Sequence, residues 1–360
     1  MDATVLTLTT AQGAALRQVR AAGRAGLAGA HARLRGHGVT EDEADALIAT
    51  LRAHARVTLN FHPDRVPPGT GPRATVAERL TADGVYRSQY ETGLSNGSRS
   101  AHTGGLRDNW EHALFGGAYQ RAAASERPKY GALNLMRHAD GGAPRFGACH
   151  VQLRQEVGER ATFCFGDSHV GPADIGTLDA LHPVLAAVVA DAAASGQSLG
   201  VAGADPVAEI RALPHARPRP PGRSLDFYVE AQVHGDIHLA RDAEALVLDP
   251  SYRGTRTGRH LEGLGVPVEW HPGFVLHPAG LEDELAAFRG PALPSVAARV
   301  SERFADGGGI DAAAIGRAAA SAVTSPLDWA AYGDPDEVLQ YIKQLWHCVA
   351  RFGVPADHPL

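Results

Sequence analysis

The sequence predicts an α+β fold, in which a sheet of mixed strand order has helices before and after it. Apolar residues recur at helical spacing near the N-terminus, short β-rich runs separated by turn residues fill the middle, and helical spacing returns towards the end. Together these patterns indicate a packed core with helical flanks. We therefore expect a helical region at 1–55, a core at 56–254 and a mostly helical region at 255–360.

The N-terminal region is predicted to contain two helices. In the first segment, Leu16, Val19, Leu27 and Leu34 follow helical spacing as far as Gly36. A second helix opens at residues 40–43 (TEDE), a capping-box pattern that marks a helix start. Its expected apolar face comprises Ala44, Leu47, Ile48 and Leu51.

The middle of the chain contains the strand signals. The segments expected to form strands, rich in β-branched and aromatic residues, are 57–61, 85–88, 146–153, 161–165, 225–234, 237–239 and 245–248. Helices are expected at about 74–82, ending at Gly84, and at 178–194. The stretch 211–223 is rich in proline and arginine, which is typical of a linker or an exposed loop.

Composition argues against several classes of protein. The content is 44% hydrophobic with a net charge of −6, which argues against disorder and against a globally basic nucleic-acid binder. No apolar run approaches the roughly 20 residues that cross a bilayer, and the N-terminus lacks a secretory pattern. Its three cysteines are too widely separated for a CxxC site. We expect a cytoplasmic protein with no membrane partner.

Common catalytic and binding motifs do not occur. The sequence has no GxxxxGK[ST] loop, no GxGxxG between a strand and a helix, and no GxSxG elbow. His234 and His238, in HGDIH, lack a third ligand at a set spacing, and HExxH is absent. We therefore expect no metal site.

Glu230 is the most informative single residue. It lies in the middle of an otherwise apolar strand, FYVEAQVHG, and burial of a carboxylate without partners is strongly unfavourable. One interpretation is that Glu230 faces a cleft and takes part in chemistry. The other is a solvent-exposed strand face, because Glu230, Gln232 and His234 alternate with apolar residues.

Several segments resemble the ADP-ribosyltransferase superfamily. NFHPDR, the helix ERLTADG and the strand VYRSQ resemble the first motif of the H-type enzymes, in which a strand-borne histidine and a second strand hold NAD. PKYGALNL (128–135) resembles the second motif, whose aromatic residue lies on the nicotinamide. RATFCFGDSH (160–169) and residues 226–248 resemble the late strands of DarT-type nucleic-acid ADP-ribosyltransferases, which contain the catalytic glutamate.

The resemblance covers roughly residues 57–250. The whole chain also resembles a bacterial family of unknown function, through NFHPDR, YRSQYETGLSNG, RFG-C-H and EAQVHG.

This resemblance implies a split β-sheet core and NAD as substrate. Cleavage of the bond between ribose and nicotinamide passes through an oxocarbenium-like state, which a fixed carboxylate stabilises. The implied catalytic residues are Glu230 and His62. The implied NAD contacts are His62, Arg65, Arg87, Ser88, Gln89, Tyr130 and Arg145, and arginines suit the pyrophosphate because a guanidinium binds phosphate bidentately.

Structural interpretations of these residues remain open. His62, before Pro63, also suits a histidine that caps a backbone turn, and Tyr130 suits a core tyrosine. Arg87 and Arg145 also suit solvated charges at strand edges. An ordinary surface loop would account equally well for Ser88, Gln89, Gly93 and Gly97.

The sequence favours an ADP-ribosyltransferase that modifies a macromolecule, either nucleic acid or protein, and it leaves open an antitoxin or immunity partner. The basic stretch 211–223 could contact phosphates or be a solvated linker. The alternatives are a module that binds NAD without turnover, and an NAD-hydrolysing or RNA 2′-phosphotransferase-like enzyme on the same scaffold. In each case we expect one cleft faced by His62, Tyr130 and Glu230, to which residues 1–55 and 255–360 contribute few groups.

Overall fold

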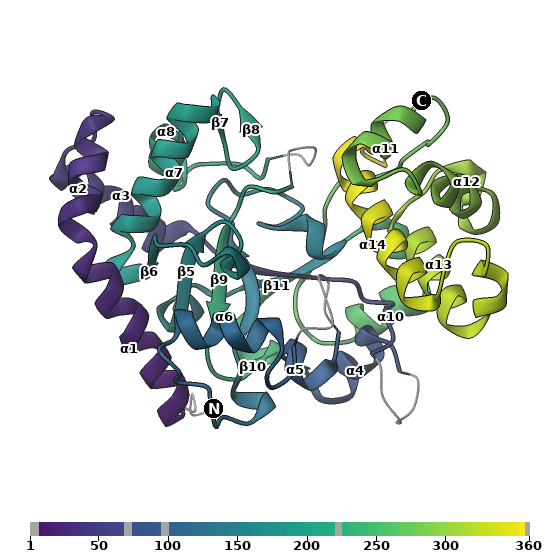
Figure 1. Ribbon diagram of the computed structural model, residues 1–360, viewed down its shortest axis with the longest axis horizontal. Helices are drawn as coiled ribbons and strands as arrows, with labels where there is room; N and C mark the ends of the chain where they lie inside the picture. Colours follow the sequence, from purple (N-terminus) through teal and green to yellow (C-terminus); the bar gives the residue numbers. More distant parts are fainter. Residues whose placement is uncertain (1–6, 68–73, 95–100, 220–224, 357–360) are drawn as a thin grey trace.

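The fold has a central sheet with helices at both ends of the molecule. The computed structural model describes residues 7–67, 74–94, 101–219 and 225–356. Within these ranges, the N-terminal helices lie at one end of the sheet and the C-terminal helices at the other (Figure 1). The predicted α+β class is confirmed. No helix in the described ranges is both long and apolar enough to cross a membrane.

Eight strands form the central sheet among the described residues, in the order β12-β11-β4-β1-β3-β9-β5-β6. Neighbours are antiparallel except β11 and β12, which are parallel. The strands are β1 (Val57–Phe61), β3 (Lys129–Leu133), β4 (Cys149–Leu153), β5 (Ala161–Phe165), β6 (Ile175–Thr177), β9 (Val229–Val233), β11 (Ala243–Leu248) and β12 (Val268–Trp270). Two separate ladders pair β2 (Val85–Tyr86) with β10 (Ile237–His238), and β7 (Gln197–Ser198) with β8 (Val201–Ala202).

The sheet opens between β1 and β3. These strands pair only at Val57–Leu133 and Thr58–Ala132, whereas β3 pairs with β9 over five residues. Gly131 lies where pairing ends, and a Cβ atom there would be 2.3 Å from the Thr58 carbonyl oxygen, so no side chain fits. Among the described residues these strands therefore belong to one hydrogen-bonded sheet, and the split that the resemblance implies is not found; β1 and β3 only diverge beyond Thr58.

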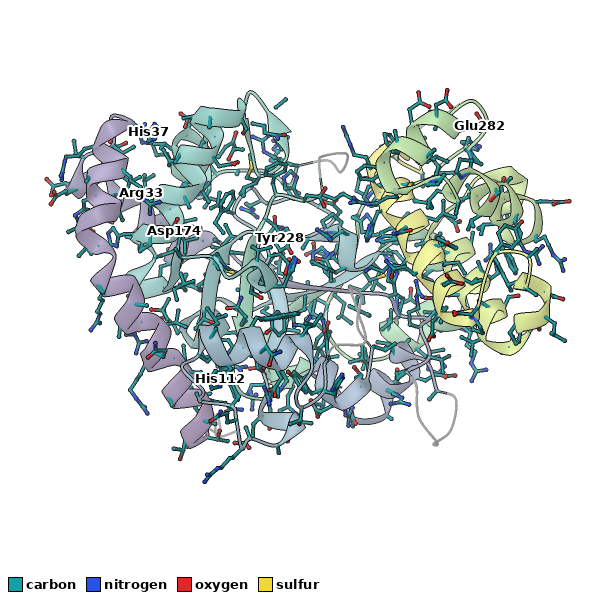
Figure 2. All side chains as sticks on the ribbon, viewed as in Figure 1. Arg33, His37, His112, Asp174, Tyr228 and Glu282 are labelled. Atoms are coloured by element: carbon teal, nitrogen blue, oxygen red, sulfur yellow. The ribbon has the colours of Figure 1, made fainter. Side chains whose placement is uncertain are left out.

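The N-terminal helices are α1 (Thr10–Ala25), α2 (Leu27–Gly36) and α3 (Glu41–His54). The predicted start of α3 is confirmed, because the Thr40 side chain accepts a hydrogen bond from the Glu43 N–H at 3.3 Å, and its predicted apolar face is buried. The first segment is helical as expected and divides at Gly26 into α1 and α2. Figure 2 shows Arg33 of α2 near Asp174, with which it pairs at 2.5 Å beside β6.

Among the described residues, six further helices lie between β1 and β11 along the chain. They are α4 (Val76–Asp83), α5 (Gln89–Thr92), α6 (Leu106–Leu114), α7 (His182–Ser195), α8 (Pro206–Ala212) and α9 (Leu239–Asp242). Gly84 ends α4 in the left-handed conformation, as its position predicts. The 3₁₀ turns are η1 (Ala124–Glu126), η2 (Pro144–Phe146), η3 (Gln155–Arg160), η4 (Ser168–Val170), η5 (Leu178–Ala180), η6 (Pro250–Tyr252), η7 (Asp306–Gly308) and η8 (Pro326–Trp329).

The C-terminal region packs as helices, with β12 added to the sheet edge. Its helices are α10 (Arg256–Glu262), α11 (Glu282–Arg289), α12 (Leu293–Phe304), α13 (Ala312–Thr324) and α14 (Pro335–Phe352). A single buried hydrophobic cluster includes Leu34, Val57 and Trp346, so it draws on all three expected segments. The flanks thus share a core with the sheet.

Several predicted boundaries were wrong. The strand expected at 146–153 begins at Cys149, because residues 144–146 form a 3₁₀ turn, and the strand expected at 85–88 ends at Tyr86, because Ser88 caps α5. The helix expected at 178–194 begins at His182. Sequence analysis missed β3, since lysine and glycine are depleted in strands. Residues 220–223 of the basic stretch, and Gly97, lie outside the described residues.

Candidate active site

A cavity of about 470 Å³ lies where β1 and β3 diverge. Its walls come from the ends of β1 and β3, α4, the β2–α5 segment, α6, the turns η2 and η4, β9 and a single residue of α14. Tyr228, directly before β9, lies near the middle of the molecule in Figure 2. The lining includes all the residues for which the sequence predicts a catalytic or NAD-binding role: His62, Arg65, Arg87, Ser88, Gln89, Tyr130, Arg145 and Glu230.

Glu230 lies on β9, opposite Ala132 of β3 and Cys164 of β5. It is 5% exposed, and every residue of β9 is buried. The interpretation of this strand face as solvent-exposed is therefore wrong. The face is covered because α6 lies across it (Figure 1), with Glu111 of α6 accepting a hydrogen bond from the Tyr130 hydroxyl at 2.8 Å.

The Glu230 carboxylate has two hydrogen-bond donors. Its Oε1 accepts from Gln232 Nε2 at 2.8 Å, and its Oε2 accepts from the backbone N–H of Ser168 at 3.3 Å, at the start of η4. Burial, together with the nearby Asp167 carboxylate, raises the pKa of Glu230 to about 7. This carboxyl can therefore exchange a proton near neutral pH.

A chain of buried hydrogen bonds leads to Glu230 from the far end of β9. Burial lowers the pKa of His234 to about 3, so its ring is neutral. The Tyr119 hydroxyl lies 2.5 Å from His234 Nδ1, and His234 Nε2 lies 3.2 Å from Thr162 Oγ1. Thr162 donates to Gln232 Oε1 at 2.7 Å. We infer that the Tyr119 hydroxyl donates to His234 Nδ1 and that His234 Nε2–H donates to Thr162 Oγ1. Each donor then points to the next group along the chain, which ends at the Glu230 carboxylate.

We expect Thr162→Val to disturb this chain without changing the shape of the core. It leaves Gln232 Oε1 and His234 Nε2 without partners, at a cost of about 1–3 kcal/mol of stability. The Gln232 amide is then less fixed, so the pKa of Glu230 should rise, since the charged form loses an oriented donor. Urea unfolding and NMR titration of the labelled carboxyl measure both effects, with the exposed Thr324→Val as control. An unchanged carboxyl titration would contradict the chain.

His62 follows β1 and packs edge-on against the Trp346 ring, at 5.3 Å between ring centroids. Burial lowers the pKa of His62 well below its ordinary value, aided by the nearby charges of Arg65, His347 and Lys343, so the imidazole is neutral. The described contact of the ring is with an aromatic side chain and not with a backbone turn, which does not support the turn-capping interpretation. The neighbouring Arg65 has a buried Nε without a partner among the described residues.

The β2–α5 segment contributes three predicted residues in different ways. Arg87 forms an ion pair with Asp83 on α4. The Ser88 hydroxyl accepts from the Glu91 N–H at 3.3 Å and donates to the Ala124 carbonyl at 2.9 Å, which favours the structural interpretation of Ser88. Gln89 has a buried Oε1 without a partner among the described residues, so it has capacity for a ligand.

Tyr130 has one ring face covered. The guanidinium of Arg107 lies 4.3 Å from the centre of that ring and 4.7 Å from the centre of the Trp110 ring, so both aromatic rings contact one cation. Arg107 Nε and one of its terminal nitrogens are buried without partners among the described residues. A nicotinamide could stack only on the opposite face of Tyr130 while Arg107 holds this position.

The cavity is strongly cationic, although the chain has a net charge of −6. Its acidic lining residues are Asp167, which pairs with His169 at 2.8 Å, and Glu230. Its cationic lining residues are Arg65, Arg79, Arg87, Arg107, Lys129, Arg145 and Lys343. Such an excess of positive charge on a concave surface favours anionic ligands.

Several lining residues were not predicted as site residues, among them Arg107, Trp110, Lys129, Asp167, His169 and Lys343, although Asp167 and His169 lie in the segment RATFCFGDSH. The composition of the chain could have pointed to two of these residues, Lys129 and Lys343. The chain has two lysines among its 34 basic residues, Lys129 and Lys343, and both line this cavity.

Two other features lie apart from the cavity. Arg219, at the end of the described part of the basic stretch, lines a second cavity of about 670 Å³ and does not line the first. Among the described residues, His31, Asp45 and His182 place possible metal-ligand atoms within 4.8 Å of one another, on α2, α3 and α7. His234 and His238 do not form a pair, since His238 is exposed while both His234 ring nitrogens have partners.

Comparison with known proteins identifies the family of the chain. No curated protein matches the chain. A family model described as "Protein of unknown function (DUF3626)" matches residues 56–352, which include every residue of the cavity wall. The chain therefore belongs to this family of proteins of unknown function.

Proposed function

We propose that this protein is an NAD-dependent ADP-ribosyltransferase that modifies a macromolecular acceptor, either nucleic acid or protein. The observation that supports it best is Glu230, a buried carboxylate with two N–H donors in the wall of a cavity whose charged lining residues are mostly cations. The motif resemblance supports it further, since the residues it selects lie around this one cavity.

The charges of the cavity suit the charges of NAD. The diphosphate of NAD is anionic, and Arg65 and Arg145 offer guanidinium groups that can bind phosphate oxygens. The ribose next to nicotinamide becomes cationic when its glycosidic bond breaks, and a carboxylate favours that change. The cavity volume of about 470 Å³ is within the range of small-molecule sites.

The residues have distinct roles in this proposal. Glu230, in its ionised form, accepts a hydrogen bond from the ribose hydroxyl and stabilises the positive charge that develops on the ring. Its alignment depends on Gln232 and on the Ser168 N–H. His62 is neutral, so it binds a hydroxyl or amide group without adding positive charge near the ribose. Gln89 offers a free acceptor to an amide or hydroxyl of the ligand.

The test is an assay of nicotinamide release from NAD by the purified protein, alone and with DNA, RNA or cell proteins. We expect release to depend on one acceptor class, with ADP-ribose attached to that acceptor. Release in water alone would instead indicate an NAD-hydrolysing enzyme. NAD binding without release under any condition would favour the sensing module and would contradict the transferase.

We expect kcat/KM for nicotinamide release to rise with pH, with a midpoint near the Glu230 pKa of about 7. The carboxylate is the active form, so about a tenth of the enzyme is competent one pH unit below that value, and the rate should rise about tenfold to its plateau. A profile that is flat between pH 5.5 and 8.5 would remove Glu230 ionisation from the mechanism.

A further inference from the structure

Helix α14 of the C-terminal region is fixed against the cavity. The buried Trp346 packs edge-on against the His62 ring and donates its Nε1–H to the Pro144 carbonyl at 2.8 Å. Lys343 lies three residues earlier on the same helix face, and it is the C-terminal residue that lines the cavity. Pro144 directly precedes Arg145 in η2. The hydrogen bond between Trp346 and Pro144 therefore brings Lys343 of α14 and Arg145 of η2 to the same wall of the cavity.

Lys343 has no anionic partner in the described structure. Its ammonium group forms no hydrogen bond or ion pair with a described residue. Its charged neighbours are the cations Arg145, Arg65 and Arg289, opposed by the carboxylate of Asp167. Burial lowers the pKa of Lys343 to about 8, and those guanidinium groups add to the effect. Gathering several cations around so few carboxylates is unfavourable unless a further anion joins them.

The neighbouring arginines have unused donors. Arg145 and Arg289 share the half-exposed Asp226, at 3.0 and 3.2 Å, so a single carboxylate serves two guanidiniums. The Nε atoms of Arg145 and Arg65 are buried without partners among the described residues. Lysine is also rare in this chain, which has two lysines among its 34 basic residues, and one of them stands at this wall.

We propose that Lys343, Arg65 and Arg145 form a phosphate subsite, completed by the C-terminal helical region, which binds the diphosphate of a nucleoside diphosphate group. The dinucleotide as ligand rests on the proposed function, whereas the affinity for a diphosphate follows from the cation cluster alone. In this arrangement the C-terminal region is part of the binding site, and its contribution is a single charged residue.

The experiment is isothermal titration of the full-length protein with inorganic pyrophosphate and, separately, with NAD. Lys343→Met keeps the side-chain length and removes the charge, and we expect pyrophosphate affinity to fall 10- to 100-fold, the usual worth of a charge-assisted contact. Lys343→Arg keeps the charge and should retain affinity within about threefold. Arg351→Met, at an exposed position on the same helix, makes the same change in net charge and should have no effect. Adenosine, which has no phosphate, should bind all variants equally.

The outcomes separate the subsite from the proposed function. Pyrophosphate binding that depends on Lys343, in a protein that never releases nicotinamide, supports the subsite and contradicts the transferase. Nicotinamide release with an unchanged KM for NAD in Lys343→Met overturns the subsite and leaves the transferase standing. Absence of pyrophosphate binding by the unmodified protein, or an equal loss of affinity in Arg351→Met, also overturns the subsite.

Discussion

Replacement of Glu230 by glutamine is expected to lower the rate of nicotinamide release about 10²- to 10³-fold, the usual effect of removing one preorganised electrostatic group. Glutamine keeps the size of the side chain and an oxygen acceptor, but it lacks the negative charge that opposes the cationic ribose. NAD affinity should change little, because the ribose carries no charge before the bond breaks. Rate and affinity are measured on the purified variant beside the unmodified protein.

At pH values above neutral, the same substitution should raise the stability of the folded protein. The folded-state pKa of Glu230, about 7, lies above its ordinary value of 4.5, so the folded protein binds this proton more tightly than the unfolded chain does. The resulting loss of stability begins as pH rises through 4.5 and is complete above about 7, with an upper limit of about 3 kcal/mol. Glutamine avoids that loss but gives up one accepted hydrogen bond, so we expect a net gain of about 2 kcal/mol at pH 8.

This gain should vanish below pH 4.5, where Glu230 is protonated in both states. Urea unfolding at pH 8 and pH 4 measures the difference, with the exposed Glu269→Gln on β12 as control. Replacing a residue that is kept only for structure would lower the stability of the protein. Lost activity combined with gained stability instead indicates a functional group. Unchanged turnover in Glu230→Gln would remove this residue from the mechanism.

Local features of the fold were predictable from the sequence because short-range rules determine them. Thr40 marks a helix start through a bond to its own third neighbour, and Gly84 marks a helix end through its backbone conformation. The position of β3 depends instead on pairing with β1 and with β9, which lies about a hundred residues further along the chain. No local pattern in a segment containing Lys129 and Gly131 indicates a central strand.

The candidate site was predictable only in part for the same reason. Motif resemblance selected His62 and Glu230, but strand alternation allowed an exposed Glu230, because alternation cannot reveal that α6 covers that face. Arg107 belongs to a helix that the pattern did not indicate. Lys343 reaches the cavity through the docking of Trp346, a contact between distant segments that sequence spacing does not encode.

Removal of the Arg127 side chain is expected to destabilise the protein by about 3–5 kcal/mol, the usual effect of breaking a buried ion pair from one side. Arg127 is almost fully buried and contacts Glu111 at 2.8 Å and Asp108 at 2.7 Å, both on α6. The Glu111 side chain is wholly buried, and burial already raises its pKa despite the opposing charge of Arg127. In Arg127→Met this carboxyl keeps the Tyr130 hydroxyl as its hydrogen-bond donor among the described residues.

The pH dependence identifies Glu111 as the cause of that loss. Without Arg127, the folded-state pKa of Glu111 should rise further above its ordinary value of 4.5, so the loss of stability should be larger at pH 8 than at pH 5. The double variant Arg127→Met, Glu111→Gln should recover most of the loss at pH 8, since no buried charge remains, whereas the exposed Arg121→Met should change stability by less than about 0.5 kcal/mol.

Because α6 positions Arg107 against Tyr130, NAD affinity should fall in Arg127→Met even where the protein stays folded. Urea unfolding at both pH values and NAD titration test this, and a double variant no more stable than Arg127→Met alone would show that the ion pair does not hold α6 over the cavity.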